Sequence, residues 1–141
     1  MYKISTRGQY ALLIMTDLAE NEGKGYTPLK TLSHRRNLST KYLEQILIQL
    51  GKNGLVCGSR GANGGYKLNR SASEYTVGEI LRAMEGELSP RGTFENNHLD
   101  SVGNEQFWEE FKQNIDSFVD SYTIDQLVQK NKDFAGYEYC I

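Results

Sequence analysis

The architecture of this chain follows from one segment, residues 39–68, which reads STKYLEQILIQLGKNGLVCGSRGANGGYKL. Its first part repeats apolar residues at three- and four-residue steps behind Ser39, a side chain that can cap a helix. Its second part holds a β-prone run, Leu55–Cys57, a glycine-dense loop over 58–65, and an alternating run, Tyr66–Leu68. The segment therefore predicts a helix followed directly by a β-hairpin.

Two further helices are predicted before this segment. Apolar residues recur at helical spacing within residues 7–21, and the glycines at 23 and 25 then mark a turn. Thr27 offers a hydroxyl cap to a helix over 28–35 that begins with proline. Helix, short turn, helix and hairpin, in this order, are the layout of a winged helix-turn-helix.

The remainder of the chain is predicted to be mainly helical. Thr76 and Glu79 form a capping box, in which the Thr side chain accepts from the amide of Glu79 and the carboxylate accepts from the amide of Thr76. A helix over 77–85 follows this box. After a loop comes a long helix with an aromatic apolar stripe, and Thr123 can cap a last short helix over 124–130.

We expect a mainly α fold with a small β-hairpin wing, arranged in three regions. These are a winged helix-turn-helix domain over 1–86, a loop over 87–104, and a dimerisation helix with a tail over 105–141, the tail starting at Asn131. The aromatic stripe on this acidic helix needs a partner surface, and a second copy of the chain is expected to supply it. The expected dimer contacts are Trp108, Phe111, Ile115, Phe118, Val119 and Tyr122.

Composition and charge restrict the classes of function. The chain has 141 residues, which suits one domain with an accessory element. No apolar run is long enough for a membrane span or a signal peptide, so we expect a soluble, cytoplasmic protein. Residues 1–82 carry 12 basic and 6 acidic side chains, whereas residues 83–141 carry 4 basic and 12 acidic ones. The N-terminal part is therefore the candidate for binding a polyanion.

The residues needed for catalysis or for a metal site are not evident. The two cysteines, Cys57 and Cys140, cannot form a disulfide framework or a four-thiolate site within one chain. We expect Cys57 to pack as a small apolar side chain, and a redox role for Cys140 stays open. Neither a nucleophile paired with a base nor a phosphate-binding loop stands out, so an enzyme is not expected.

Five motifs together resemble the Rrf2 family of bacterial transcription regulators. They are KISTRGQYA (3–11), YLEQI (42–46), GLV (54–56), RGANGGY (60–66) and TVGEI (76–80). The resemblance covers residues 2–86 and implies a dimeric winged-helix protein that binds double-stranded DNA. It also implies backbone contacts near the first helix, from Lys3, Ser5, Thr6 and Arg7.

Further DNA contacts are expected from the recognition helix and the wing. Residues at the start of a recognition helix enter the major groove first, and Gln and Glu one turn later can still reach adenine and cytosine. An arginine on the wing can enter a narrow minor groove, and wing glycines allow close approach to phosphates. The candidates are Ser39, Thr40, Lys41, Glu44 and Gln45 on the helix, and Arg60, Gly64, Gly65 and Tyr66 on the wing.

The sequence departs from the cluster-binding members of the family, which carry three closely spaced cysteines in the loop that corresponds to 87–104. That loop has no cysteine here, and His98 is its single soft ligand. The resemblance is therefore to the cluster-free branch, which regulates cysteine metabolism, and no metal or cofactor is expected. In that branch the implied partner is cysteine synthase, which receives a C-terminal tail similar to residues 137–141. A tail folded back onto the aromatic stripe remains the alternative.

The sequence thus predicts a homodimeric, sequence-specific transcriptional repressor, with sulfur or cysteine genes as the expected targets. Two alternatives stay open. One is a winged helix that binds another protein, and the other is a redox-responsive regulator of the same family. The positive charge of residues 1–82 favours DNA.

Overall fold

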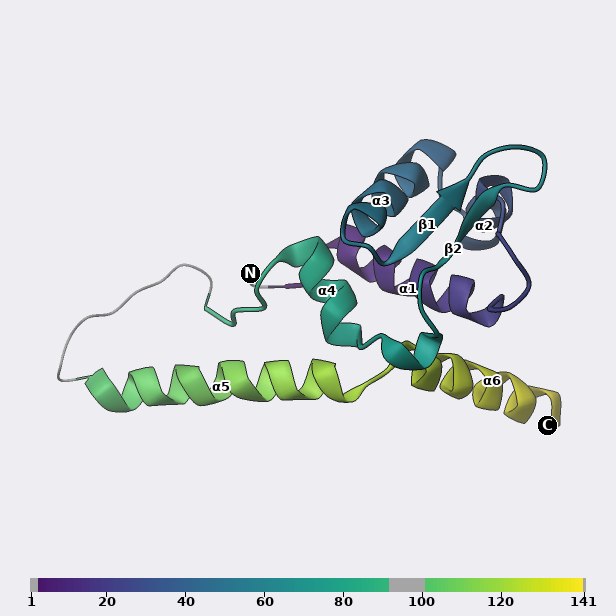
Figure 1. Ribbon diagram of the computed structural model, residues 1–141. Helices are drawn as coiled ribbons and strands as arrows, with labels where there is room; N and C mark the ends of the chain where they lie inside the picture. Colours follow the sequence, from purple (N-terminus) through teal and green to yellow (C-terminus); the bar gives the residue numbers. More distant parts are fainter. Residues whose placement is uncertain (1–2, 92–100, 141) are drawn as a thin grey trace.

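Three helices and a hairpin build the N-terminal part of the molecule (Figure 1). The computed structural model describes residues 3–91 and 101–140. The first elements are α1 (Thr6–Glu20), α2 (Leu29–Arg36), α3 (Thr40–Lys52), β1 (Val56–Ser59) and β2 (Gly65–Leu68). Asn37 adopts a left-handed φ of 53° and keeps the turn between α2 and α3 short. The predicted winged helix-turn-helix is confirmed.

The hairpin is joined to the start of α2. The two strands are antiparallel, and Tyr66 of β2 lies opposite Gly58 of β1. On its other side Tyr66 exchanges two backbone hydrogen bonds with Thr27, of 2.8 and 2.9 Å. The predicted hydroxyl cap by Thr27 is wrong, because Pro28 occupies the N-cap position of α2 and the Thr27 hydroxyl accepts from Asn21 at 3.0 Å. The extended backbone of Thr27 instead completes the edge of the sheet.

Two wing glycines are required by this arrangement. Gly65 has a φ of +146°, and a Cβ atom there would overlap the carbonyl oxygen of Thr27. A Cβ atom at Gly64 would overlap the carbonyl oxygen of Ser59. Both positions therefore demand glycine for the packing of the hairpin, independently of any ligand.

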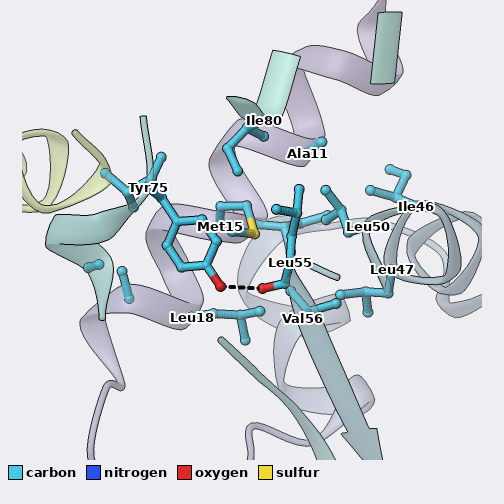
Figure 2. Packing of buried hydrophobic residues seen from close by; sticks show 14 of the residues in the cluster. Ala11, Met15, Leu18, Ile46, Leu47, Leu50, Leu55, Val56, Tyr75 and Ile80 are labelled. Atoms are coloured by element: carbon cyan, nitrogen blue, oxygen red, sulfur yellow. Dashed lines mark hydrogen bonds between the residues drawn. The ribbon is translucent and has the colours of Figure 1, made fainter. Parts of the chain in front are cut away.

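A single apolar core lies between α1, α3 and the wing, and Tyr75 closes one side of it (Figure 2). Tyr75 is fully buried, and its hydroxyl donates to the carbonyl oxygen of Leu55 at 2.7 Å. The same hydroxyl accepts from the amides of Asn69 at 3.1 Å and Arg70 at 3.0 Å. These bonds satisfy backbone groups at the base of the wing, so the orientation of the wing depends on the core.

The predicted helix caps are largely confirmed. Ser39 accepts from the amide of Tyr42, and Thr76 accepts from the amide of Glu79, each at 3.1 Å. The second half of the capping box does not form as predicted. Both carboxylate oxygens of Glu79 instead accept from Arg70 Nη2 at 2.7 Å, because the guanidinium is a stronger donor than a neutral amide.

The C-terminal elements first extend away from the winged helix-turn-helix and then pack against it again (Figure 1). They are a 3₁₀ turn η1 (Ala72–Glu74), α4 (Val77–Glu85), α5 (Val102–Ser121) and α6 (Ile124–Cys140). Helix α5 projects from the body, whereas α6 packs against α1 through Ile124 and Val128, which join the core. The start of α5 at Val102 shortens the expected loop, and His98 lies outside the described residues.

The predicted tail from Asn131 onward is wrong as far as Cys140, because α6 continues to that residue. Two buried residues anchor the start of the helix on the core, and no proline interrupts the later residues. Ile141 lies outside the described residues. Within the part of the chain that the structure describes, none of the helices has the length and apolarity to cross a bilayer.

Candidate nucleic-acid interface

The outward face of α3 is polar and basic. Lys41, Gln45, Ile48 and Lys52 succeed one another at three- or four-residue steps and are all exposed. Glu44 borders this face, and the opposite face carries the buried residues Leu43, Ile46, Leu47 and Leu50. The burial of one face fixes which side of α3 can meet a ligand. Ser39 and Thr40, at the start of the helix, are exposed as well.

Ile48 is a candidate that sequence reasoning missed. It is 47% exposed, although it is a large apolar residue in the middle of a helix. The sequence pattern could have revealed it. The buried residues nearest to it in α3 are 46, 47 and 50, and Ile48 falls outside that repeat. On a recognition helix, an exposed apolar side chain suits the methyl group of thymine.

The start of α1 lies beside α3 and brings Arg7 to Gln45. Arg7 Nη2 donates to Gln45 Oε1 at 3.2 Å, and the guanidinium lies 5.9 Å from the centre of the Tyr42 ring. Tyr10 meets the same ring edge-on at 6.0 Å. The structure thus joins two predicted site residues, Arg7 and Gln45, that are far apart in sequence. Lys3 and Thr6 are exposed nearby.

Ser5 is held by a contact inside the protein. Its side chain accepts from the amide of Gly8 at 3.0 Å and caps α1. Its amide donates to Glu85 Oε1 at 2.8 Å, and its hydroxyl donates to the same oxygen. Glu85 belongs to the last turn of α4, so Ser5 fixes the start of α1 to α4. The Ser5 hydroxyl has a structural role in this position.

The wing presents one arginine at its tip. Arg60 is exposed, next to Gly61 with a φ of +101°. Tyr66 is half-buried, and Gly64 and Gly65 are enclosed by the hairpin, as described above. Lys67 is exposed, with its ammonium 4.7 Å from the centre of the Tyr26 ring. Arg60 and Lys67 are therefore the basic side chains that the wing offers to a ligand.

Several other basic residues are occupied by carboxylates. Arg35 and Arg36 of α2 hold the buried carboxylate of Asp17 at 3.0 and 2.7 Å. Arg70 is held by Glu79, and the pKa of its guanidinium is raised mainly by that hydrogen bond. Among the ion pairs of residues 3–91 and 101–140, none involves Lys3, Lys41 or Arg60. The start of α1, α3 and the wing therefore each present basic side chains outside these ion pairs.

Helix α5 carries the aromatic stripe, and none of its residues is buried. Phe107, Phe111 and Phe118 are 53%, 41% and 64% exposed. Together with Ile115 and Val119 they line an open hollow of about 380 Å³. Of the predicted dimer contacts, Trp108, Ile115, Val119 and Tyr122 are half-buried, and Phe107 is an additional member of the stripe.

Ion pairs fasten α5 to α4. Arg82 of α4 donates to Asp120 at 2.8 Å and to Asp116 at 3.0 Å, which raises the pKa of the guanidinium. The pKa of Asp116 is lowered, first by Lys112 at 2.9 Å and then by Arg82. Arg91 pairs with Glu105 at 2.8 Å and lowers the pKa of that carboxyl. The orientation of α5 therefore depends on charged contacts.

Comparison with known proteins gives one consistent result. Residues 4–130 match the Rrf2 family, described as an iron-dependent transcriptional regulator. The chain is 38% identical over 125 residues to the HTH-type transcriptional regulator CymR of Bacillus subtilis, covering 89% of this chain and 88% of that protein. It is 34% identical over 133 residues to the regulator IscR of Pectobacterium carotovorum, covering 92% and 81%.

The solved structure of CymR, described as the global cysteine regulator of B. subtilis, superposes with a TM-score of 0.81. The two chains are 38% identical in this comparison, which covers 92% of this chain and 98% of CymR.

The donor set of the described residues does not fit the iron in the family description. The sequence holds two cysteines, and Cys57 lies half-buried on β1. Within residues 3–91 and 101–140, no three His, Cys, Asp or Glu side chains gather closely enough to bind a metal ion. Iron–sulfur clusters are held mainly by cysteine thiolates, and the described residues do not supply such a set.

Proposed function

The chain belongs to the Rrf2 family of transcriptional regulators and is a DNA-binding regulator, and on that premise we propose that it acts as a homodimeric repressor of sulfur or cysteine genes. The observation that carries the DNA-reading part is the outward face of α3. This face is exposed and basic. The buried residues on the opposite face fix the orientation of the helix. A rigid helix of this kind can be presented to the major groove without rearrangement.

The proposed contacts divide into those that position the protein and those that read bases. Lys3, Thr6 and Lys41 are exposed and suit phosphate oxygens. Glu44 and Gln45 face outward one turn into α3 and suit base edges. Arg60, at the wing tip, suits the minor groove. Ser39 and Thr40 offer hydroxyl groups to the backbone at the start of α3.

The test of DNA reading uses two variants on exposed surfaces. Duplexes selected from a random library by the wild type are titrated at one fixed salt concentration with Gln45→Ala and Arg60→Ala. Each variant should lose about 1 to 3 kcal/mol of binding free energy while keeping its melting temperature. Asp133→Ala, at an exposed position in the middle of α6, serves as the control and should bind as the wild type does. Unchanged affinity in both test variants would refute this assignment.

The homodimer is proposed from the exposed stripe of α5. Its phenylalanines are exposed in the single chain and surround a hollow. The exposure of so much apolar surface to water is unfavourable. A second α5 carries the same stripe, so a two-fold contact would cover both. Such a dimer places two α3 helices on one duplex, and its bulk excludes other proteins from the occupied site. Repression is tested by transcription in vitro from a promoter that contains the selected site.

The target genes are proposed from similarity to CymR, described as the global cysteine regulator of B. subtilis. Transcripts are compared between the parent organism and a strain lacking this chain, with cysteine supplied and withheld. Sulfur and cysteine genes should rise in the deletion strain when cysteine is supplied. If these transcripts do not change, the regulon assignment is wrong, but the assignment of DNA binding is unaffected.

Cysteine synthase is proposed as a partner through the last turns of α6. The residues from Asn131 to Gly136 are exposed, and Figure 1 shows α6 running away from α5. Docking in extended form requires the end of α6 to unwind, which Gly136 makes easier because glycine favours the coil. Deleting residues 140 and 141 should abolish the response of DNA binding to cysteine synthase and leave the intrinsic affinity unchanged. A truncated protein that still responds would exclude this mode.

A further inference from the structure

Arg7 occupies an unusual position for a residue that would simply neutralise phosphates. It is half-buried at the junction of α1 and α3, with its guanidinium near the Tyr42 ring and one N–H group donated to Gln45. Lys3 and Lys41 are exposed instead. The planar guanidinium is thereby held in place before any DNA arrives.

The hydrogen bond at 3.2 Å fixes how Gln45 presents its amide. The carbonyl oxygen Oε1 accepts from Arg7 and faces α1. The two N–H donors of Nε2 take no part in this bond, and the neighbouring guanidinium has further N–H groups beside them.

This arrangement changes the base that Gln45 suits. A glutamine whose amide oxygen and nitrogen are both free pairs with adenine, accepting from N6 and donating to N7. With Oε1 accepting from Arg7, one lone pair of that oxygen is engaged, and the positive guanidinium beside it favours base acceptors over the N6 amino donor of adenine. Guanine presents two acceptors, N7 and O6, in the major groove and no donor there. Guanine is therefore the better match.

Resting on the proposed DNA-reading role of α3, we infer that Arg7 is a positioning residue that makes Gln45 select guanine over adenine at the base pair it faces. Arg7 acts through Gln45, so removing Arg7 should change which base is preferred. Removing a phosphate contact should weaken binding to all sequences alike.

The experiment is selection of duplexes from a random library by the full-length protein, followed by titration of the selected sites. The proteins compared are the wild type, Arg7→Met, Gln45→Ala and the double variant. Lys41→Met is the matched control, because Lys41 is an exposed basic residue of the same interface. Affinity is measured over a range of salt concentrations for each protein.

The wild type should enrich guanine at one position of each half-site. Arg7→Met should lower the preference for guanine over adenine there by about tenfold. In the Gln45→Ala background the same substitution should leave the base preference unchanged, since the residue it acts through is missing. Lys41→Met should keep the wild-type preference, bind all sites more weakly, and lower the salt slope by about one.

A second measurement needs no protein variant. The guanine at the selected position is replaced by 7-deazaguanine, which lacks the N7 acceptor. The wild type should then lose about tenfold in affinity, whereas Arg7→Met should lose much less.

Two other results would contradict the proposals, each a different one. Unaltered base frequencies in Arg7→Met, together with a reduced salt slope, would show Arg7 to be a phosphate contact and overturn the inference. Failure of the wild type to bind any duplex would instead overturn the proposed DNA-reading function. The two failures are thus separate.

Discussion

At the scale of single residues, the wing is positioned by groups that are buried beneath it. The Tyr75 hydroxyl joins three backbone groups at the base of the hairpin, and the glycines of the hairpin permit its contact with Thr27. None of these residues needs to touch DNA. In the proposed complex with DNA, their effect on binding would come from the direction in which they hold Arg60.

Tyr75→Phe should destabilise the protein by about 1 to 3 kcal/mol, because the carbonyl of Leu55 and two amides lose a buried partner. The free energy of unfolding in urea measures this. Tyr10→Phe, which removes a hydroxyl from a half-buried ring at the α1–α3 junction, is the control and should change stability by less than about 0.5 kcal/mol. Equal losses in both variants would contradict the role given to the Tyr75 hydroxyl.

Gly65→Ala should also destabilise the protein, since the new methyl group overlaps the Thr27 carbonyl and the φ of +146° disfavours any side chain. We expect a loss above about 2 kcal/mol, read from thermal unfolding. Gly103→Ala is the matched control on α5, where no described atom beyond the neighbouring residues and backbone of the helix lies within 4 Å of the added carbon. That variant should be neutral or slightly more stable, because alanine favours a helix.

At the scale of elements, the junction of α4 and α5 includes ion pairs, whereas the junction of α6 and α1 is held by apolar burial. Arg82 holds two aspartates of α5, and Ile124 and Val128 anchor α6 in the core. The two junctions should therefore respond differently to pH. Only the first should weaken as carboxylates become protonated.

The sign of the pH effect follows from the lowered pKa values of Asp116 and Glu105. The unfolded chain binds protons at these groups more readily than the folded one. The stabilisation is fully present above about pH 5 and is lost as pH falls through the lowered values. Between about pH 6 and about pH 3, Arg82→Met should lose less stability than the wild type, because its Asp116 has lost one of its partners. Urea unfolding at both pH values tests this, and parallel losses would contradict it.

At the scale of the whole molecule, the aromatic stripe of α5 stays exposed among the described residues, although ion pairs join this helix to α4. A projecting helix with three exposed phenylalanines is a poor end state for a protein in water, and the proposed two-fold dimer would remove that exposure. The same dimer would set the spacing of the two α3 helices. In that proposal the distance between half-sites in the operator depends on α5 as much as on α3.

Phe111→Glu and Phe118→Glu should each convert the dimer to a monomer, because a carboxylate would be buried in an apolar contact. Sedimentation at micromolar concentration measures this. Gln113→Glu adds the same charge to α5 away from the stripe, where Gln113 contacts Glu109, and should leave the dimer intact. A monomeric wild type would remove the dimer proposal.

The sequence by itself determined the order of the elements and most of their ends. Helical periodicity, the caps at Ser39 and Thr76, and the glycine-dense turn between two β-prone runs act over a few residues, so they can be recognised without the fold. The same local patterns placed Lys41 and Gln45 on an outward face and Arg60 on a wing.

Only the tertiary structure decided how these pieces act on one another. It assigned Thr27 to the sheet edge, extended α6 to Cys140, and fixed Ser5 to Glu85. It also separated the arginines held by carboxylates from those that remain available. These outcomes depend on pairs of residues that lie far apart in the chain, and Arg7 with Gln45 is the clearest case. A local pattern carries no information about such pairs, because their contact exists only when the helices have packed.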